Sequence, residues 1–319
     1  MLIDLSEACE FIRNCNDAVI LTHQSPDGDC IGSGLALQDI LKSLGKRSRV
    51  ICCDEFPKRY DFMTKCADND TNFTPQNIIA VDIADAQLMG SLKEIYADKV
   101  QLCIDHHISN VNYAQKTLLN PQASATCEVI YEIAAALGVT ITDFCAMCIY
   151  TGMATDTGCF KYENTSARCH EITAELMKNH KLKYALINRN MFDVKSIGRI
   201  RMEKAVMEIM EYYLDNRLTI ICITSDILKS MNVDGNDLEG CASLPLQVEG
   251  VEVGVTIKEK STGVYKVSMR SANEVNVSDI CKLLGGGGHI KAAGCLIEGS
   301  LEFVKKTIID AVRKGMDGE

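Results

Sequence analysis

The chain has 319 residues, of which 47% are hydrophobic, and it carries a formal net charge of −10. This length and apolar content are sufficient for two domains with separate cores, which excludes a mainly disordered chain. The acidic balance argues against a broad surface for long duplex nucleic acid, because such surfaces need many Lys and Arg contacts. A small anionic substrate held by metal ions remains compatible with this charge.

The chain has no apolar run approaching the roughly 18 to 20 residues that a membrane helix needs, and its first residues are acidic and amphipathic, unlike a signal peptide. The sixteen cysteines are scattered through apolar periodic segments, as is typical of reduced, buried thiols. Cys145 and Cys148 form a C-x-x-C pair without a second pair at zinc-finger spacing, so we interpret them as core residues. We expect a cytoplasmic protein without a membrane partner.

The first half of the chain alternates between apolar runs and helical periodicity. The predicted strands are DAVILTH, SRVICC, NIIAVD and VQLCID, and helices are predicted over residues 31–44 and 125–137. This alternation is typical of an α/β fold with a doubly wound, mainly parallel sheet covered by helices on both faces. We assign residues 1–185 to this first domain.

The second half begins after a charged, helical stretch without a Gly or Pro cluster, which we interpret as a helical linker over residues 186–214. Three β-rich runs follow, RLTIICIT, VEVGVTIKE and VYKVSMRS, of which the last two are separated by the turn segment KSTG. A glycine cluster and a helix over residues 301–313 complete the chain. Residues 215–319 are therefore predicted to form a second, smaller α/β domain.

Acidic and imidazole side chains follow several predicted strands at the points where the strands end. Ligands of open parallel sheets bind beyond the carboxyl ends of the strands, so these side chains are expected to converge. Close oxygen and imidazole donors suit a manganese-like ion. The candidates are His23, Asp27 and Asp29 in H-Q-S-P-D-G-D, Asp82 and Asp85 in V-D-I-A-D, Asp105, His106 and His107 in I-D-H-H, and Asp156 in G-M-A-T-D-T-G.

Each of these residues also has an ordinary interpretation, because a loop Asp often caps a helix and a lone His is often a surface or core residue. Taken together they favour a metal site, since an apolar strand that ends in Asp-His-His has a high desolvation cost unless those groups bind something. Asp85 is interpreted as the N-terminal acid of the next helix, and Ser124 and Thr126 as N-cap residues, although a helix start near phosphate stays open. No role for Cys30 follows from the sequence.

These motifs, in this order, resemble the DHH phosphoesterase family, whose name describes Asp105, His106 and His107. The resemblance implies two Mn²⁺ ions, one bound by His23, Asp27 and Asp82 and the other by Asp29, Asp82, His106 and Asp156. Asp82 would bridge the two ions. It further implies catalytic roles for His107, Asp82 and Asp105, with Asp105 orienting a neighbouring histidine and His107 contacting the phosphate or the leaving oxygen.

The glycine cluster reads L-L-G-G-G-G-H-I-K-A-A-G over residues 283–294. Consecutive glycines lose much conformational entropy when the chain folds. Close contact between their backbone amides and an anion would compensate for this loss. The run also resembles the DHHA1 domain, in which M-R-S matches a basic strand end that contacts substrate phosphate. The substrate-binding candidates are therefore Arg270, Gly285, Gly286, Gly287, Gly288 and His289.

A compact DHH plus DHHA1 chain is similar to oligoribonucleases that also remove the 3′-phosphate from phosphoadenosine phosphate. The resemblance thus implies short oligonucleotides or nucleotide phosphates as substrates and two Mn²⁺ as cofactors. Cyclic di-AMP or its linear product pApA is the alternative substrate, and a non-catalytic nucleotide-binding module is the alternative of another class. The glycine run argues against an inorganic pyrophosphatase, and the aspartate-rich ligand set favours manganese over zinc. The sequence leaves a homodimer open.

Overall fold

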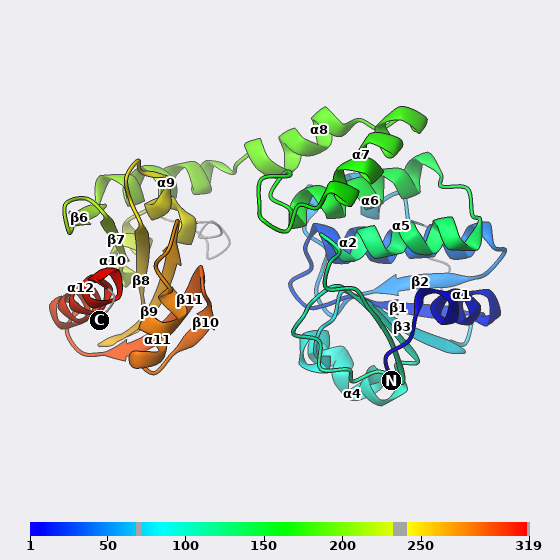
Figure 1. The fold of residues 1–319 in the computed structure, drawn as a ribbon, viewed down its shortest axis with the longest axis horizontal. Helices are drawn as coiled ribbons and strands as arrows, with labels where there is room; N and C mark the ends of the chain where they lie inside the picture. Colours follow the sequence, from blue (N-terminus) through cyan, green and yellow to red (C-terminus); the bar gives the residue numbers. More distant parts are fainter. Residues whose placement is uncertain (68–71, 232–240, 318–319) are drawn as a thin grey trace. The chain divides into compact units, whose positions relative to one another are not determined.

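The structure is a computed structural model that describes residues 1–67, 72–231 and 241–317, shown as a ribbon in Figure 1. The chain divides into two compact units, Met1–Val194 (unit 1) and Lys195–Glu319 (unit 2). Within the described residues, none of the helices combines the length and the apolar character needed to cross a bilayer. The α/β class expected from the sequence is confirmed in both units.

Unit 1 is built on a five-stranded sheet of order β2-β1-β3-β4-β5, in which all neighbouring strands are parallel. From β1 the chain leads to β2 on one side, and after β2 it crosses to β3 on the other side of β1. This reversal between β1 and β3 is a topological switch point, where open α/β sheets bind ligands at the strands' carboxyl ends. The strands are β1 (Ala18–Leu21), β2 (Ser48–Ile51), β3 (Asn77–Val81), β4 (Leu102–Asp105) and β5 (Lys116–Leu119).

Helices cover both faces of this sheet, as the doubly wound prediction requires. Alternate strand residues such as Ile20 and Ile79 pack against α1, α2, α5 and α6, whereas Val19 and Ile78 pack on the opposite face, where α4 lies in Figure 1. The helices are α1 (Leu5–Asn14), α2 (Gly28–Ser43), α3 (Asp61–Thr64), α4 (Lys93–Tyr96), α5 (Thr126–Leu137), α6 (Asp143–Asp156), α7 (Ala167–Asn179) and α8 (Tyr184–Asn188), with 3-10 segments η1 (Lys58–Tyr60), η2 (Ala86–Leu92) and η3 (Ala97–Lys99).

The cysteines take part in this packing as free thiols. All fifteen cysteines whose side chains the structure describes are unpaired by disulfides. Cys145 and Cys148 lie on α6 and are fully buried in the larger core of unit 1. The core interpretation of the C-x-x-C pair is therefore confirmed.

The predicted linker over residues 186–214 is divided between the two units. Ile187 on α8 is buried in unit 1, where the Tyr150 hydroxyl lies 3.0 Å from the Asn188 side-chain oxygen, and a short π-helical segment η4 (Arg189–Asp193) follows. Helix α9 (Ile197–Glu208) belongs to unit 2 and buries Met202 and Val206 against that unit's sheet. The last predicted linker residues form a strand, β6 (Glu211–Tyr213), because they pair with β7.

Unit 2 contains a mixed six-stranded sheet of order β10-β11-β9-β8-β7-β6. Strands β7 and β8 are parallel, and the other neighbouring pairs of this sheet are antiparallel. Helices α11 and α12 pack on one face of it, and α9 with the 3-10 segment η6 (Cys241–Gln247) packs on the β7 side of the other. The remaining elements are β7 (Leu218–Ile223), α10 (Ser225–Met231), β8 (Val253–Ser261), β9 (Val264–Ser271), α11 (Val277–Leu283), β10 (Gly287–His289), β11 (Ala292–Glu298) and α12 (Leu301–Asp317).

Candidate metal centre

The carboxyl ends of three neighbouring strands bring polar residues together in unit 1. His23 follows β1, Asp82 directly follows β3, and Asp105 ends β4, so the order β1-β3-β4 places them along one edge of the sheet. Asp82 has a positive φ of 58°, a conformation that non-glycine residues adopt rarely and that often marks a functional position. The convergence predicted from the strand ends is thus present in the structure.

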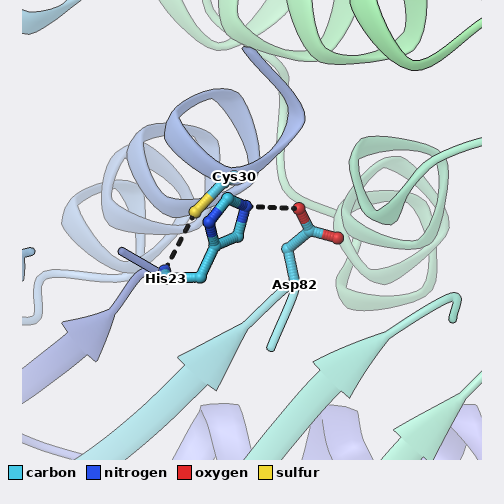
Figure 2. Close-up of side chains that lie close together, drawn as sticks. All are labelled: His23, Cys30 and Asp82. Carbon is cyan, nitrogen blue, oxygen red and sulfur yellow. Dashed lines mark hydrogen bonds and ion pairs between the residues drawn. The ribbon is translucent and has the colours of Figure 1, made fainter. Parts of the chain in front are cut away.

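His23 faces Asp82 across this edge, as Figure 2 shows. The Nδ1 atom of His23 lies 2.8 Å from the Gln24 carbonyl oxygen, which can only accept, so Nδ1 carries the hydrogen. The other ring nitrogen, Nε2, lies 3.6 Å from Asp82 and 3.7 Å from Asp27. Burial alone lowers the pKa of His23, but the nearby carboxylates of Asp27 and Asp82 outweigh it and raise the pKa.

Cys30 belongs to the first turn of α2. Its side chain lies beside His23, as Figure 2 shows. Its sulfur accepts a hydrogen bond from the His23 backbone amide at 3.2 Å. Burial raises the pKa of this thiol to about 12, so it stays protonated near neutral pH. Cys30, which the sequence left unexplained, therefore has a structural contact that fixes the turn carrying His23.

Asp29 is buried at the N-terminal end of α5, although it belongs to α2. Its carboxylate accepts hydrogen bonds from the backbone amides of Thr126 at 2.6 Å and Cys127 at 2.9 Å. Burial and the negative charges of Asp82, Asp156 and Asp27 raise its pKa well above the ordinary value. A cation in this position would relieve that repulsion.

His106 has a buried ring nitrogen without a hydrogen-bond partner. Its Nδ1 lies 3.1 Å from the Ala123 carbonyl oxygen and so carries the hydrogen. Its Nε2 is buried, makes no hydrogen bond, and lies 3.5 Å from Asp156 and 3.9 Å from Asp82. An orphaned buried nitrogen costs free energy unless something binds it, and an imidazole nitrogen that faces two carboxylates is a metal ligand arrangement.

Asp105 is fully buried and organises the other member of the histidine pair. It accepts hydrogen bonds from the backbone amides of His106 and His107, from Nδ1 of His107 at 2.8 Å and from Asn110 at 2.6 Å. Burial acts to raise the pKa of Asp105, but the hydrogen bonds from His107 and Asn110 prevail and lower it. The hydrogen bond to Asp105 raises the pKa of His107 to about 9, while 42% of the His107 side chain is exposed. His107 is therefore a positively charged group open to a ligand.

Asp156 ends α6 and completes the set. Burial raises its pKa to about 6; the His106 and His107 charges oppose this shift, and Asp82 and Asp27 reinforce it. Gly152, one turn earlier, allows α6 to approach, because a Cβ atom there would lie 2.8 Å from Asp29 and 2.2 Å from the Cys127 sulfur. The small residues near Asp156 thus serve close packing around the carboxylates.

Among the residues that the structure describes, three overlapping groups of donor atoms could each hold an ion, and within each group the atoms lie within 4.8 Å of one another. Asp82 and His106 each belong to two of these groups. Asp27 belongs to none of them, although its carboxylate lies near His23. Oxygen and imidazole donors, surplus negative charge and the orphaned His106 nitrogen together fit a divalent cation such as Mn²⁺. The groups are His23 with Cys30 and Asp82, Asp82 with His106 and His107, and Asp29 with His106 and Asp156.

The structure shows the local contacts of Asp85 and Thr126, both of which were predicted to lie at the start of a helix. Asp85 caps the following 3-10 segment by accepting from the Gln87 amide at 2.8 Å, which confirms its ordinary interpretation. The N-cap prediction for Thr126 is wrong, because the cap position is Ala125 and the Thr126 hydroxyl donates to Asp82 at 2.8 Å. Sequence reasoning also missed Asn110, whose only signal is its position five residues after Asp105.

The predicted substrate-binding residues lie in unit 2. Gly285 has a φ of 77° just after α11, and Gly287–His289 form the edge strand β10 rather than a loop. In register, His289 pairs with Ala292, and Ala292 pairs with Arg270 on β9. Paired residues project from the same face, so Arg270 and His289 share one face with a small residue between them.

Two domain families match the chain: the DHH family N-terminal domain over residues 17–153 and the DHHA1 domain over residues 220–314. The chain is 31% identical over 302 residues to the bifunctional oligoribonuclease and PAP phosphatase NrnA of Thermus thermophilus, covering 92% of this chain and 89% of that protein. A solved exopolyphosphatase-related protein from Bacteroides fragilis is 26% identical, with a TM-score of 0.85 over 97% of this chain and 95% of that chain.

A more distant structure supports the fold alone. The exonuclease RecJ bound to manganese is 12% identical, with a TM-score of 0.53 over 98% of this chain and 95% of that chain. The identity and coverage of the Thermus protein, together with the two matched domains, show the family directly. The chain, a hydrolase with its acidic and imidazole residues gathered at one sheet edge, therefore belongs to the DHH/DHHA1 family of phosphoesterases.

Proposed function

We propose that this phosphoesterase uses two Mn²⁺ ions to hydrolyse short oligoribonucleotides and to remove the 3′-phosphate from 3′-phosphoadenosine 5′-phosphate. The observation that carries the proposal is the central position of Asp82, which faces His23 on one side and His106 on the other. His23, Asp27 and Asp82 would hold one ion. Asp29, Asp82, His106 and Asp156 would hold the second.

The tautomers of the histidines support this assignment. In His23 and His106, Nδ1 is occupied by a backbone carbonyl, which leaves Nε2 as the only ring donor toward the carboxylates. Divalent ions in such a site polarise phosphoryl oxygens and make a water nucleophilic near neutral pH. Thr126 and the α5 amides keep Asp82 and Asp29 in fixed orientations.

His107 has a separate role in the proposal. Asp105 accepts the Nδ1 hydrogen, so Nε2–H of the protonated ring remains for a ligand on this partly exposed side chain. A cationic donor there would bind a phosphoryl oxygen or donate a proton to the leaving oxygen. Arg270 and the glycine run of unit 2 would contribute substrate contacts. The relatives from Thermus thermophilus and Mycoplasma genitalium, named bifunctional oligoribonuclease and PAP phosphatase, support the substrate class.

The test uses metal-stripped protein with and without added Mn²⁺, assayed against a diribonucleotide, a longer oligoribonucleotide, phosphoadenosine phosphate and cyclic di-AMP. We expect manganese-dependent hydrolysis of the first three. Cleavage of cyclic di-AMP alone would assign the alternative substrate class instead.

The matched variants are Asp82→Asn, which keeps the shape of the side chain, and Asp61→Asn, at a half-buried carboxylate on α3 that forms an ion pair with Lys65. Asp82→Asn should abolish turnover and Mn²⁺ binding measured by calorimetry, with an unchanged circular dichroism spectrum, whereas Asp61→Asn should match the wild type. Full activity of Asp82→Asn would refute the two-metal proposal.

A further inference from the structure

One face of the unit 2 sheet is open beside the glycine run. On β9, Lys266, Ser268 and Arg270 alternate with the buried Tyr265, Val267 and Met269, so the first three project away from the core. On the same face, η6 covers Gly254 of β8, where a Cβ atom would lie 2.8 Å from Pro245. The neighbouring strands β11 and β10 present small or exposed residues to this face.

The strand register aligns these residues in rows. Arg270 pairs with Ala292 and Ser268 with Gly294, and Gly294 pairs in turn with Gly287 on β10. Nothing lies within 4 Å of a Cβ atom placed on Gly287. The sheet surface beside β9 is therefore glycine backbone without side chains, and an extended chain can lie close to it.

The next pair of residues along β9 and β11 adds a cationic and an apolar side chain to the same surface. Lys266 pairs with Leu296, of which 62% is exposed, and Lys260 lies nearby on β8. These side chains and the glycines line a surface depression of about 530 Å³. Neither Lys260 nor Lys266 has an ion-pair partner among the described residues. Glu298, two residues after Leu296 and on the same face, ends the cationic stretch.

The spacing along β9 matches a polyanion. At about 3.3 Å per residue, Ser268 lies about 7 Å and Lys266 about 13 Å from Arg270 along the strand. The spacing of about 7 Å between alternate residues of β9 is comparable with the distance between successive phosphates of an extended single strand. Beside Lys266, the exposed aliphatic side chain of Leu296 suits the apolar face of a base. Single strands are usually bound in positively charged grooves whose side chains also contact the faces of the bases.

We infer that this face carries a second phosphate-binding position, formed by Lys266 and Lys260 with Leu296 as a base contact, beyond the position at Arg270. The inference deepens the proposed function and rests on it: the extra position is filled by oligoribonucleotides of three or more residues and stays empty with a dinucleotide or phosphoadenosine phosphate. Lys266 is thus a determinant of substrate length rather than of the reaction.

The variants to compare are Lys266→Ala, the conservative Lys266→Arg and the control Lys306→Ala. Lys306 is exposed on α12, the helix that packs on the opposite face of the sheet, and its substitution removes the same charge. Lys266→Ala should lower kcat/KM for a pentaribonucleotide about three- to tenfold, through KM, because a charge-assisted phosphate contact is lost. Values for the diribonucleotide and phosphoadenosine phosphate should change less than about twofold. Lys266→Arg and Lys306→Ala should resemble the wild type.

Binding of a labelled pentaribonucleotide, followed by fluorescence anisotropy without added metal, gives a readout independent of turnover. The slope of log K against log salt should be shallower in Lys266→Ala by at most about 0.7, the value for one phosphate contact on a single strand. Equal losses for all substrates, or an unchanged pentamer affinity and slope, would overturn the inference. If the wild type hydrolyses no oligoribonucleotide, the proposed function fails, while the anisotropy comparison still decides whether Lys266 binds a single strand.

Discussion

At the scale of single residues, His23, His106 and His107 share one proton arrangement. Each ring has its Nδ1 beside an acceptor, a backbone carbonyl for the first two and Asp105 for the third. Nε2 is therefore the free atom in all three rings. The difference lies in the acceptor: Nδ1 of His107 donates to the Asp105 carboxylate, whereas in His23 and His106 a backbone carbonyl accepts from Nδ1 and Nε2 faces carboxylates.

The role of Asp105 can be tested with Asp105→Asn. An amide offers one oxygen where the carboxylate offers two, so one of the four donors around Asp105 would face another donor. We expect a loss of about 1.5 to 3 kcal/mol in the free energy of unfolding, measured with urea. NMR titration of the metal-free protein should also show the His107 pKa falling from about 9. The control change Asp61→Asn, at a half-buried position on α3, should cost less than about 0.5 kcal/mol. An unchanged His107 titration would contradict this role.

Asp156 makes the stability of the metal-free protein depend on pH. Folded Asp156 keeps its proton up to about pH 6, whereas the unfolded chain releases it near the ordinary value of 3.8. The folded state binds the extra proton between these values, so its stability falls as pH rises through this interval. Relative to Asp156→Asn, the wild type should lose at most about 3 kcal/mol between pH 4 and pH 7, measured by urea unfolding with a chelator. Saturating Mn²⁺ should reverse this loss, and a pH-independent difference would refute it.

At the scale of elements, the packing of α6 on α2 and α5 fixes the spacing of the carboxylates. Gly152→Ala would place a methyl group against Asp29 and the Cys127 sulfur. Glycine to alanine normally stabilises a helix interior, but here we expect a loss of about 1 to 3 kcal/mol and weaker Mn²⁺ binding. Cys127→Ala should restore part of the stability in the double variant, since it removes the closer contact. The double-mutant cycle in urea measures this coupling, and strict additivity would argue against it.

The sequence predicted the elements that carry a strong pattern. The four predicted strands of unit 1 are all present; β1, β3 and β4 are apolar runs buried on both faces, whereas β2 alternates between buried and half-buried residues. The polar residues at the ends of β1, β3 and β4 were the basis of the predicted metal site. Strand β5, with only two buried residues in K-T-L-L, has no such pattern and was missed. The contact of Thr126 with Asp82 was also out of reach, because it joins residues 44 positions apart through the tertiary fold.

The glycine run is more regular in structure than the sequence suggests. Four glycines indicate a loop when read locally, but Gly287 and Gly288 pair with Gly294 and Ala293 to extend the sheet. Edge pairing of this type is decided by β11, not by the intrinsic preference of glycine, which is low in strands. The helical linker failed at its end for the same reason, because β7 recruits Glu211–Tyr213 as a strand.

At the scale of the whole molecule, the two units have separate hydrophobic cores. The clusters built on Ile20 and Val19 belong to unit 1, and those built on Val255 and Ile221 belong to unit 2. All the proposed metal ligands lie in unit 1, and all the proposed phosphate contacts of Arg270, Lys266 and the glycine run lie in unit 2. Metal binding and oligonucleotide capture should therefore be separable.

We predict that a fragment ending at Val194 folds and binds Mn²⁺ with an affinity close to that of the full chain. Its core and its ligands are complete without residues 195–319, so calorimetric titration should show the same stoichiometry, and the fragment carrying Asp82→Asn should bind no Mn²⁺. Hydrolysis of a pentaribonucleotide should nevertheless fall at least about a hundredfold, because remote binding contacts contribute to transition-state stabilisation. A fragment that folds but binds no Mn²⁺ would mean that unit 2 supplies a ligand, and undiminished hydrolysis would mean that substrate is held by unit 1 alone.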